Sequence, residues 1–269
     1  MHAPRVRGVY HLHTYRCRHA RGDAVHYAQE ARAAGLQRIG VADHTPLPDG
    51  RWPTVRMQLA ELADYEAAVE SARAAVPELE ILLGMECEIE PAYFGWYRDT
   101  FLARGYNYLI GSVHFVTVGD EELSAFGACR SVEALVQWVQ RIRQACESGL
   151  FAFIAHPDNI ACGDPAAWTP EVAAATREVC AIAAAHGMPL ELNALGLMEG
   201  RGYPWRPFWE LAAEAGCHAV LSTDAHRPQH TARGLSQIAD LAAELGLRVV
   251  EPLTADRRGP DGAGPRPHP

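Results

Sequence analysis

Short apolar runs of five to seven residues recur along the chain and are separated by longer segments with helical spacing. Most of these runs carry apolar residues at successive positions, so both faces of each predicted strand are expected to be buried. Strands of this kind are typical of a parallel sheet covered by helices. The predicted strands are residues 6–10, 38–42, 81–87, 108–113, 151–155, 189–193 and 219–223.

The segments between the strands are rich in alanine, with apolar residues three or four positions apart, which indicates amphipathic helices. Several of these segments end at a glycine, as at Gly149 and Gly246, in the manner of helix C-caps. The predicted helices are residues 24–34, 55–75, 132–148, 170–186, 207–215 and 231–245.

The alternation of strand and helix predicts an α/β fold, a distorted seven-stranded (β/α)7 TIM-like barrel. The chain has 269 residues, 48% of them hydrophobic, which suffices for one such domain over residues 1–255. Residues 256–269 are mostly proline, glycine and arginine and are expected to be a disordered tail. Two irregular loops, residues 45–54 and 196–207, follow strand ends and are expected to overhang the functional site.

Charge and cysteine usage narrow the classes of partner and compartment. The formal net charge of −9 argues against a long nucleic-acid partner, because binding to phosphate backbones favours a basic surface. The seven cysteines form no C-x-x-C pair, which favours a reduced, cytoplasmic chain. We expect no secretory leader and no membrane span, because no apolar run approaches the roughly 18 residues that a span needs. No oligomeric state follows from the sequence.

Histidines and carboxylates stand at or just after the ends of nearly all the predicted strands. Strand ends of a parallel barrel converge on one face, so residues far apart in the chain can meet there. Imidazole and carboxylate groups together are ligands for divalent transition metals. The candidate metal ligands are His11, His13, His19, His44, Glu86, His114, His156, Asp224 and His226.

Any single one of these histidines is more often a structural or surface residue than a ligand. The recurrence at successive strand ends, and the two-residue spacing of His11 and His13, favour the metal site instead. Nearby acidic residues are expected to orient ligands or to bind solvent. They are Asp43, Glu88, Glu90 and Asp158.

Nine candidate ligands exceed what one ion of four to six ligands can use, so two or three ions with a bridging carboxylate are expected. Clustered divalent ions acidify a bound water and stabilise the charge that develops on a phosphoryl or acyl centre. The chain has no Ser-His-Asp order, no G-x-S-x-G elbow and no Walker-type loop. These observations favour a metal-assisted hydrolase.

Seven short motifs at these strand ends occur together in one known family. They are His11-Leu12-His13 with Cys17-Arg18-His19, Ala42-Asp43-His44, Gly84-Met85-Glu86, Gly111-Ser112-Val113-His114-Phe115, Ile154-Ala155-His156, Glu191-Leu192-Asn193 and Ser222-Thr223-Asp224-Ala225-His226-Arg227-Pro228. With them the chain, over residues 10–228, resembles the PHP (polymerase and histidinol phosphatase) family. The stretch around Cys17, the long helix after His44 and the loop at Tyr203 resemble its monofunctional histidinol-phosphatase branch.

The resemblance implies a site with three divalent ions and assigns their ligands. A first ion would be held by His11, His13, Glu86 and Asp224. Glu86 would bridge to a second ion held by His114 and His156. The third would be held by His19, His44 and His226. Catalysis would then be attack on phosphorus by a metal-bridging hydroxide, with Glu86, Asp224 and His226 as the catalytic ligands. The all-nitrogen-and-oxygen ligand set is compatible with zinc, manganese or iron.

One departure from the family pattern concerns the substrate. Histidinol phosphatases commonly show Gly-Leu-Arg after the asparagine of the sixth strand, whereas this chain has Met198 at the arginine position. Arg201, and second Arg227, are the candidates to replace that arginine, and Asn193 is a further candidate contact to the substrate.

The resemblance implies a phosphomonoesterase that converts L-histidinol phosphate to L-histidinol and phosphate in histidine biosynthesis. A PHP-type phosphoesterase or nuclease acting on nucleotides or oligonucleotide ends is the alternative. The net acidity and the lack of a stripe of basic and aromatic residues argue against it. A third hypothesis is a metal-storing or regulatory module without catalysis, which the complete set of candidate ligands disfavours.

Overall fold

A parallel sheet with helices on its outer face forms the core of the protein. The computed structural model describes residues 6–127, 131–160 and 165–252. The sheet strands are β1 (Gly8–Val9), β2 (Arg38–His44), β3 (Glu80–Glu88), β4 (Tyr108–Ser112), β7 (Phe153–Ile154), β8 (Leu190–Asn193), β9 (His218–Ser222) and β10 (Arg248–Val249). A separate antiparallel hairpin is formed by β5 (Phe115–Val118) and β6 (Glu121–Ser124).

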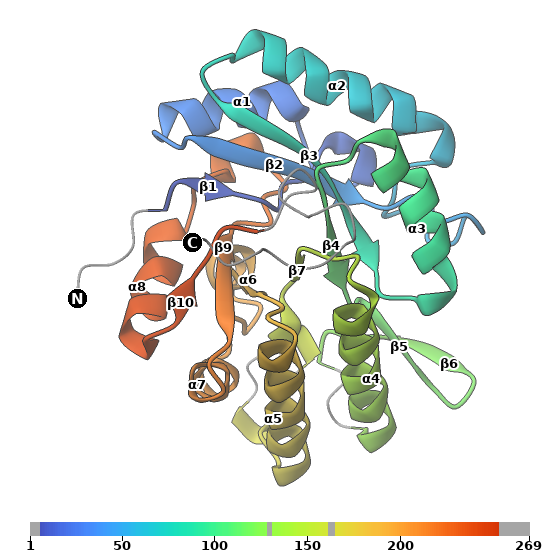
Figure 1. Ribbon diagram of the computed structural model, residues 1–269, viewed down its shortest axis with the longest axis vertical. Helices are drawn as coiled ribbons and strands as arrows, with labels where there is room; N and C mark the ends of the chain where they lie inside the picture. Colours follow the sequence, from blue (N-terminus) through green and yellow to red (C-terminus); the bar gives the residue numbers. More distant parts are fainter. Residues whose placement is uncertain (1–5, 128–130, 161–164, 253–269) are drawn as a thin grey trace, which may run out of the picture.

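The helices surround the sheet, as Figure 1 shows. They are α1 (Ala24–Ala33), α2 (Leu62–Ala75), α3 (Phe94–Thr100), α4 (Val132–Ser148), α5 (Pro170–Ala185), α6 (Ala194–Glu199), α7 (Arg206–Glu214) and α8 (Leu235–Leu245). Local sequence explains where several of them begin and end. The side chain of Ser131 accepts a hydrogen bond from the Ala134 amide at the start of α4, and Gly149 ends that helix with a left-handed backbone.

All pairings within the eight-stranded sheet are parallel, and the strands follow one another in chain order. The sheet curls until its first and last parts meet. Leu12, just after β1, forms an isolated parallel bridge with Ala225, just after β9, and the His13 amide donates to the Ala225 carbonyl at 3.0 Å. The carboxyl ends of β1 and β9 therefore adjoin.

Two apolar clusters hold this arrangement together. The larger lies between sheet and helices and includes Val41 and Met85 of the strands. The smaller fills the space enclosed by the sheet and is dominated by Tyr108 and Phe153. Alternation along β2 and β3 produces both clusters, because successive side chains of a strand point to opposite faces. His44 and Glu86 have the parity of the inward-facing positions and sit at the carboxyl ends.

The seven predicted strands correspond to β1 to β4 and β7 to β9, so the parallel α/β sheet is confirmed. The described sheet holds eight strands, however, and the predicted count of seven is not confirmed. The additional β10 contains only two residues and pairs with the amino-terminal half of β9, where Arg248 lies opposite His218. Its brevity left no recognisable strand pattern in the sequence.

The helix predictions agree closely with α1, α4, α5 and α7, whereas the helix expected over residues 55–75 begins at Leu62 and the one over 231–245 at Leu235. The predicted disordered tail, residues 256–269, lies outside the described residues. None of the helices in the described ranges is both long and apolar enough to cross a membrane. The five cysteines within those ranges are free and buried.

Candidate metal centre

The carboxyl ends of the sheet strands bring the nine candidate ligands to one place. His44 and Glu86 are direct neighbours in the parallel register of β2 and β3. His114 follows β4 and His156 follows β7, while Asp224 and His226 follow β9. His19 lies in the loop after the short 3-10 helix Tyr15–Cys17. Residues separated by up to 215 positions thus share one site because parallel strands end at the same edge.

Glu86 occupies the middle of this group and is 1% exposed. Its Oε2 atom lies 2.6 Å from His44 Nδ1 and 3.3 Å from His11 Nε2. Its Oε1 atom lies 3.2 Å from His114 Nε2 and 3.3 Å from His156 Nε2. His13 Nε2 also lies 3.6 Å from Oε2. The two oxygens of one carboxylate therefore face separate sets of imidazoles, which is the arrangement that a bridging ligand needs.

Three groups of side chains, which resemble the sets implied by the family resemblance except that Glu86 is absent from the first, place their ligand atoms within 4.8 Å of one another. The groups are His11, His13 and Asp224; Glu86, His114 and His156; and His19, His44 and His226. His13, His44 and Glu86 form a further such group that connects them. The structure brings all nine predicted ligands together, and their binding of ions remains a prediction.

Each of three histidines also contacts a carboxylate outside the ligand set. Glu191 Oε1 lies 2.8 Å from His11 Nδ1, and Glu88 Oε2 lies 2.9 Å from His114 Nδ1. Asp43 Oδ1 lies farther away, 3.5 Å from His13 Nδ1, and makes no directed hydrogen bond to it. A carboxylate at Nδ1 holds the ring with Nε2 free for a metal and makes the imidazole a better donor.

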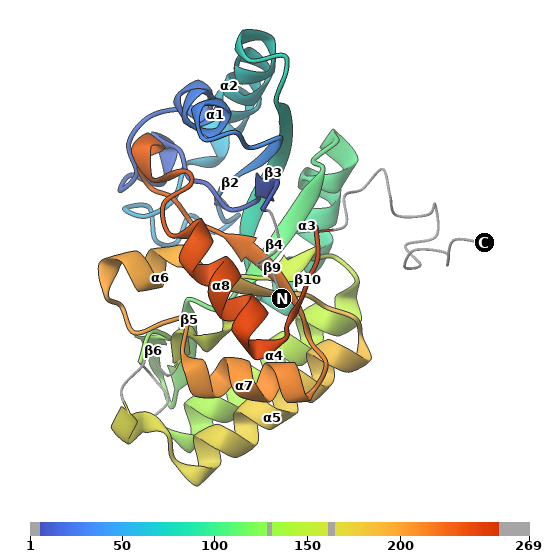
Figure 2. The same cartoon turned by 90° about the vertical axis from the view of Figure 1, so that its left-hand side faces the viewer.

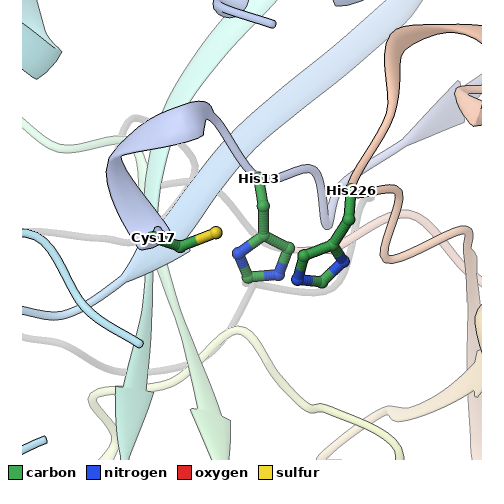
Figure 3. A group of neighbouring side chains, drawn as sticks. All are labelled: His13, Cys17 and His226. Atoms are coloured by element: carbon green, nitrogen blue, oxygen red, sulfur yellow. The ribbon is translucent and has the colours of Figure 1, made fainter. Parts of the chain in front are cut away.

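Cys17 lies beside His13 on the side away from His226, as Figure 3 shows. Its sulfur points toward the His13 ring, and His13 and His226 are stacked with ring centroids 4.2 Å apart. The thiol is fully buried, and burial raises its pKa above the ordinary value. Cys17 therefore packs against a ligand as a neutral thiol, although its sulfur also lies close enough to join a metal group with His13 and His226.

Two of the candidate ligands have strained backbones. His156 has φ of 27° and Asp224 has φ of 47°, a left-handed region that non-glycine residues seldom adopt. Hydrogen bonds hold one of them in place, since the His156 amide donates to Glu191 Oε2 at 2.9 Å. Strain that is retained by surrounding contacts is typical of functional sites.

Electrostatic interactions within the cluster raise the pKa of some of its histidines and lower the pKa of others. Burial opposes protonation of both His11 and His13. The negative charges of Asp224, Glu191 and Glu86 outweigh it at His11, and direct interaction with the Asp224 and Asp43 carboxylates outweighs it at His13, so the pKa of both rings is raised well above the ordinary value. Burial and the charge of nearby His13 lower the pKa of His226 to about 3. Without cations, protons on His11 and His13 thus bind the carboxylates together.

The carboxylates of the cluster are ionised. Burial alone would raise the pKa of Glu86, but the imidazoles of His44, His11 and His114 outweigh it and hold this pKa well below the ordinary value. Burial is likewise outweighed at Asp224, where His11 and His13 lower the pKa. Both groups can therefore act as anionic ligands.

The donor set fits divalent metal ions. Within the described residues, six atoms at the centre are buried and make no properly directed hydrogen bond. They are His11 Nε2, His13 Nδ1, His13 Nε2, His44 Nδ1, Glu86 Oε1 and Glu86 Oε2. Unpaired buried polar atoms are costly, and ligation to a cation would satisfy them.

A cavity of about 200 Å³ opens beside the cluster. One wall consists of candidate ligands, including His19, His44, His114 and His226. Further lining residues come from the loop after β2, the β5–β6 hairpin with the residues that follow it, and α6. They are Val55, Arg56, Phe115, Ser124, Phe126 and Leu195. The hairpin and α6 lie on the same side of the molecule in Figure 2.

The predicted substrate contacts have different positions relative to this cavity. Arg201 lines it but is exposed, and its Nε and Nη2 atoms donate to Glu199 Oε2 at 2.9 and 2.6 Å. Arg227 is exposed and is not among the residues that line the cavity. Asn193 is buried and donates to Glu191 and to Asp224, so its amide orients two carboxylates.

Sequence reasoning gave no role to Glu191, Cys17 or Arg56. Glu191 stood inside a family motif, but which histidine it contacts depends on how β8 packs beside β1 and β7. Arg56 lies in a loop whose path carries no periodic signal. The contacts of these three residues could therefore not be predicted from the sequence, which shows only their chemical type.

Comparisons with known proteins agree with this geometry. The PHP domain matches residues 10–194 of the chain. A curated protein of Deinococcus radiodurans named "Probable histidinol-phosphatase" is 30% identical over 259 residues, which cover 89% of this chain and 94% of the relative.

Two solved structures have a similar fold. The hisK protein of Listeria monocytogenes superimposes with a TM-score of 0.73 at 20% identity and covers 86% of this chain and 99% of its own. The histidinol phosphate phosphatase HisK of Lactococcus lactis, solved with zinc, L-histidinol and phosphate, has a TM-score of 0.72 at 16% identity. It covers 92% of this chain and 97% of its own.

The fold and the cluster define a class of proteins in which a curled parallel sheet, enclosed by helices, carries a site able to hold metal at its carboxyl edge. Within this class, the chain belongs to the PHP family. The resemblance predicted from the strand-end motifs is thereby confirmed.

Proposed function

We propose that the protein is a metal-dependent histidinol-phosphatase that hydrolyses L-histidinol phosphate to L-histidinol and phosphate. The observation that carries this proposal is the position of Glu86, whose two oxygens face separate sets of imidazoles beside a cavity of about 200 Å³. The Deinococcus relative and the Lactococcus structure, with its bound histidinol and phosphate, support this substrate.

The proposal includes three divalent ions, held by the three groups of ligands described above. Charge supports the binding of several cations. The buried carboxylates Asp43, Glu86, Glu88, Glu191 and Asp224 belong to or adjoin the ligand groups, and Arg56 is the buried guanidinium that lines the cavity beside them. Divalent ions would balance this excess of negative charge and that of a dianionic phosphate ester. When bound, such ions acidify a coordinated water and stabilise the charge on phosphorus.

The chain's own residues orient and enclose the substrate in this proposal. Glu191 and Glu88 fix the rings of His11 and His114, so the phosphate enters a site that needs little rearrangement. Phe115, Phe126 and Leu195 provide the apolar wall against which an imidazole ring can pack.

We further propose that the fold is a distorted seven-stranded barrel formed as one domain by residues 1–255. The bridge between Leu12 and Ala225 would close it between β1 and β9, and β10 would fill the gap at the amino-terminal end of these strands.

Phosphate release by purified protein loaded with zinc, manganese or iron tests the function. Histidinol phosphate should be hydrolysed far faster than sugar phosphates or nucleotides. Equal, slow rates on all three substrate classes would refute the assignment. Release of nucleotides from short oligonucleotides would indicate the PHP-type nuclease instead.

A further inference from the structure

Arg56 is a buried cation in the wall of the cavity. It lies between β2 and α2, its exposed fraction is 3%, and it lines the same cavity as His44 and His114. Among the described residues, Arg56 and Arg201 are the arginines that line this cavity. A buried guanidinium loses hydration and must gain from a specific partner.

Three neighbours fix the Arg56 side chain. Its Nη2 atom donates to Glu88 Oε2 at 3.0 Å, and its Nη1 atom donates to the Thr45 carbonyl at 3.4 Å. The guanidinium carbon lies 4.8 Å from the ring centroid of Trp52, which in turn stacks on Phe115 with centroids 4.1 Å apart. The Arg56 guanidinium group is therefore held in a fixed orientation before any ligand binds.

These contacts leave the guanidinium incompletely used. Its Nε atom is buried and has no hydrogen-bond partner among the described residues, and the two terminal nitrogens donate once each. An arginine carries five N–H donors in one plane, so donors remain for an anion. Phosphate oxygens match this planar fork.

The other cationic candidates are less suited to hold a phosphate. Arg201 is exposed and its fork is engaged by Glu199. Met198 brings no charge and lies beside Gly234, the residue that precedes α8, where a Cβ would lie 3.3 Å from its Sδ atom. Arg56 is the cation that the fold both buries and positions beside the candidate ligands.

We propose that Arg56 binds the phosphate group of the substrate and of the product, and that Glu88 is its positioning residue. This proposal rests on the proposed phosphatase function. Glu88 accepts from the Arg56 guanidinium and from the His114 backbone amide, and its Oε2 contacts His114 Nδ1. One carboxylate thus sets the distance between the phosphate-binding cation and a metal-binding imidazole.

Binding of inorganic phosphate to the metal-loaded full chain, measured by calorimetry together with metal content, tests this role. Arg56→Gln should weaken phosphate binding about ten- to a hundred-fold, as expected for loss of a charge-assisted hydrogen bond. Arg51→Gln is the matched control, because Arg51 also lies over Trp52 but is paired with Asp49 outside the cavity. It should leave phosphate affinity unchanged.

Unchanged phosphate affinity in Arg56→Gln with full metal content would overturn the proposal. If that variant loses metal, Arg56→Lys decides. A lysine that restores metal content while phosphate binding stays at least about ten-fold weak supports the proposal. If Arg56→Lys restores both metal content and phosphate affinity, or restores neither of them, the proposal is overturned. Because the probe is inorganic phosphate, intact phosphate binding without histidinol phosphate turnover would refute only the proposed substrate.

Discussion

Glu86 lies among the imidazoles of the cluster, since five imidazole nitrogens lie within 3.6 Å of its carboxylate. Glu86→Gln keeps the shape but removes the charge that two ions would share. We expect activity to fall by several orders of magnitude and at least one ion per chain to be lost, as measured by phosphate release and elemental analysis. Glu80→Gln, at the exposed beginning of the same strand, should change neither.

Glu191 controls the cluster without contributing a predicted ligand. Its Oε1 contacts His11, and its Oε2 accepts from the His156 amide and from Asn193. Glutamine at this position must turn an NH₂ donor toward one of these donors. We therefore expect Glu191→Gln to weaken metal binding about ten- to a hundred-fold in a competition titration with a chelator. Wild-type metal affinity in this variant would contradict the proposed orienting role.

The meeting of the nine ligands was predictable because strand ends of a parallel sheet converge whatever the loops between them do. Roles that depend on side-chain packing were not predictable. Asp43 and Glu88 stood out as orienting candidates by position, but the partner of each, and the role of Arg56, follow from rotamers and loop paths that a single sequence does not encode visibly.

At the scale of elements, Tyr108 of β4 determines how closely β2 and β3 curl around the enclosed core. A Cβ atom on Gly84 would lie 2.4 Å from the Tyr108 ring, and one on Gly40 would lie 2.0 Å from its hydroxyl. That hydroxyl donates to the Tyr10 carbonyl at 2.6 Å, so the ring cannot move freely.

Gly84→Ala is therefore expected to lower the free energy of unfolding by about 1–3 kcal/mol through overpacking, measured by urea denaturation. Gly95→Ala in α3 is the matched control. Its Cβ would meet nothing within 4 Å, and alanine in a helix should raise the free energy of unfolding by up to about 1 kcal/mol. Equal stability of both variants would show that the ring of Tyr108 yields at little cost.

The length of a helix or strand determined whether it could be predicted from the sequence. The 17-residue α4 and 16-residue α5 have enough turns for periodicity to be seen, and the prediction placed both within one residue. The short α6 falls in a segment rich in glycine, where an irregular loop was predicted. The β5–β6 hairpin and β10 have two to four residues per strand, too few for a pattern to be distinguished from a loop.

At the scale of the whole molecule, the same charges stabilise the fold and select what the site binds. The carboxylates at the mouth of the sheet come from β3, β8 and the ends of β2 and β9, so their mutual repulsion acts on the closure of the sheet itself. Either protons on His11 and His13 or divalent ions must counter that repulsion. The stability of the fold therefore depends on whether protons or divalent ions occupy the site.

This dependence predicts that a rise in pH destabilises the stripped protein but not the metal-loaded protein. Without ions, the pKa values of His11 and His13 are raised in the folded state, so their stabilisation is complete below 6.5 and is lost as pH rises through the raised values. The depressed pKa of Glu86 gives stabilisation that is present above 4.5 and is lost in acid. The lowered pKa values of His44 and His226 add stabilisation that is present above 6.5 and is lost as pH falls below that value. Chelator-treated protein should therefore be most stable close to pH 6.5.

Raising the pH from 6 to 9 should lower the melting temperature of chelator-treated protein by on the order of 5–10 °C, measured by circular dichroism. Zinc- or manganese-loaded protein should not show this fall, because ions displace the two protons and bind more tightly as protons become scarce. The stabilisation by metal should consequently grow with pH. A melting temperature of the stripped protein that stays constant or rises over this interval would show that His11 and His13 are not the proton-binding groups that join the sheet at its mouth.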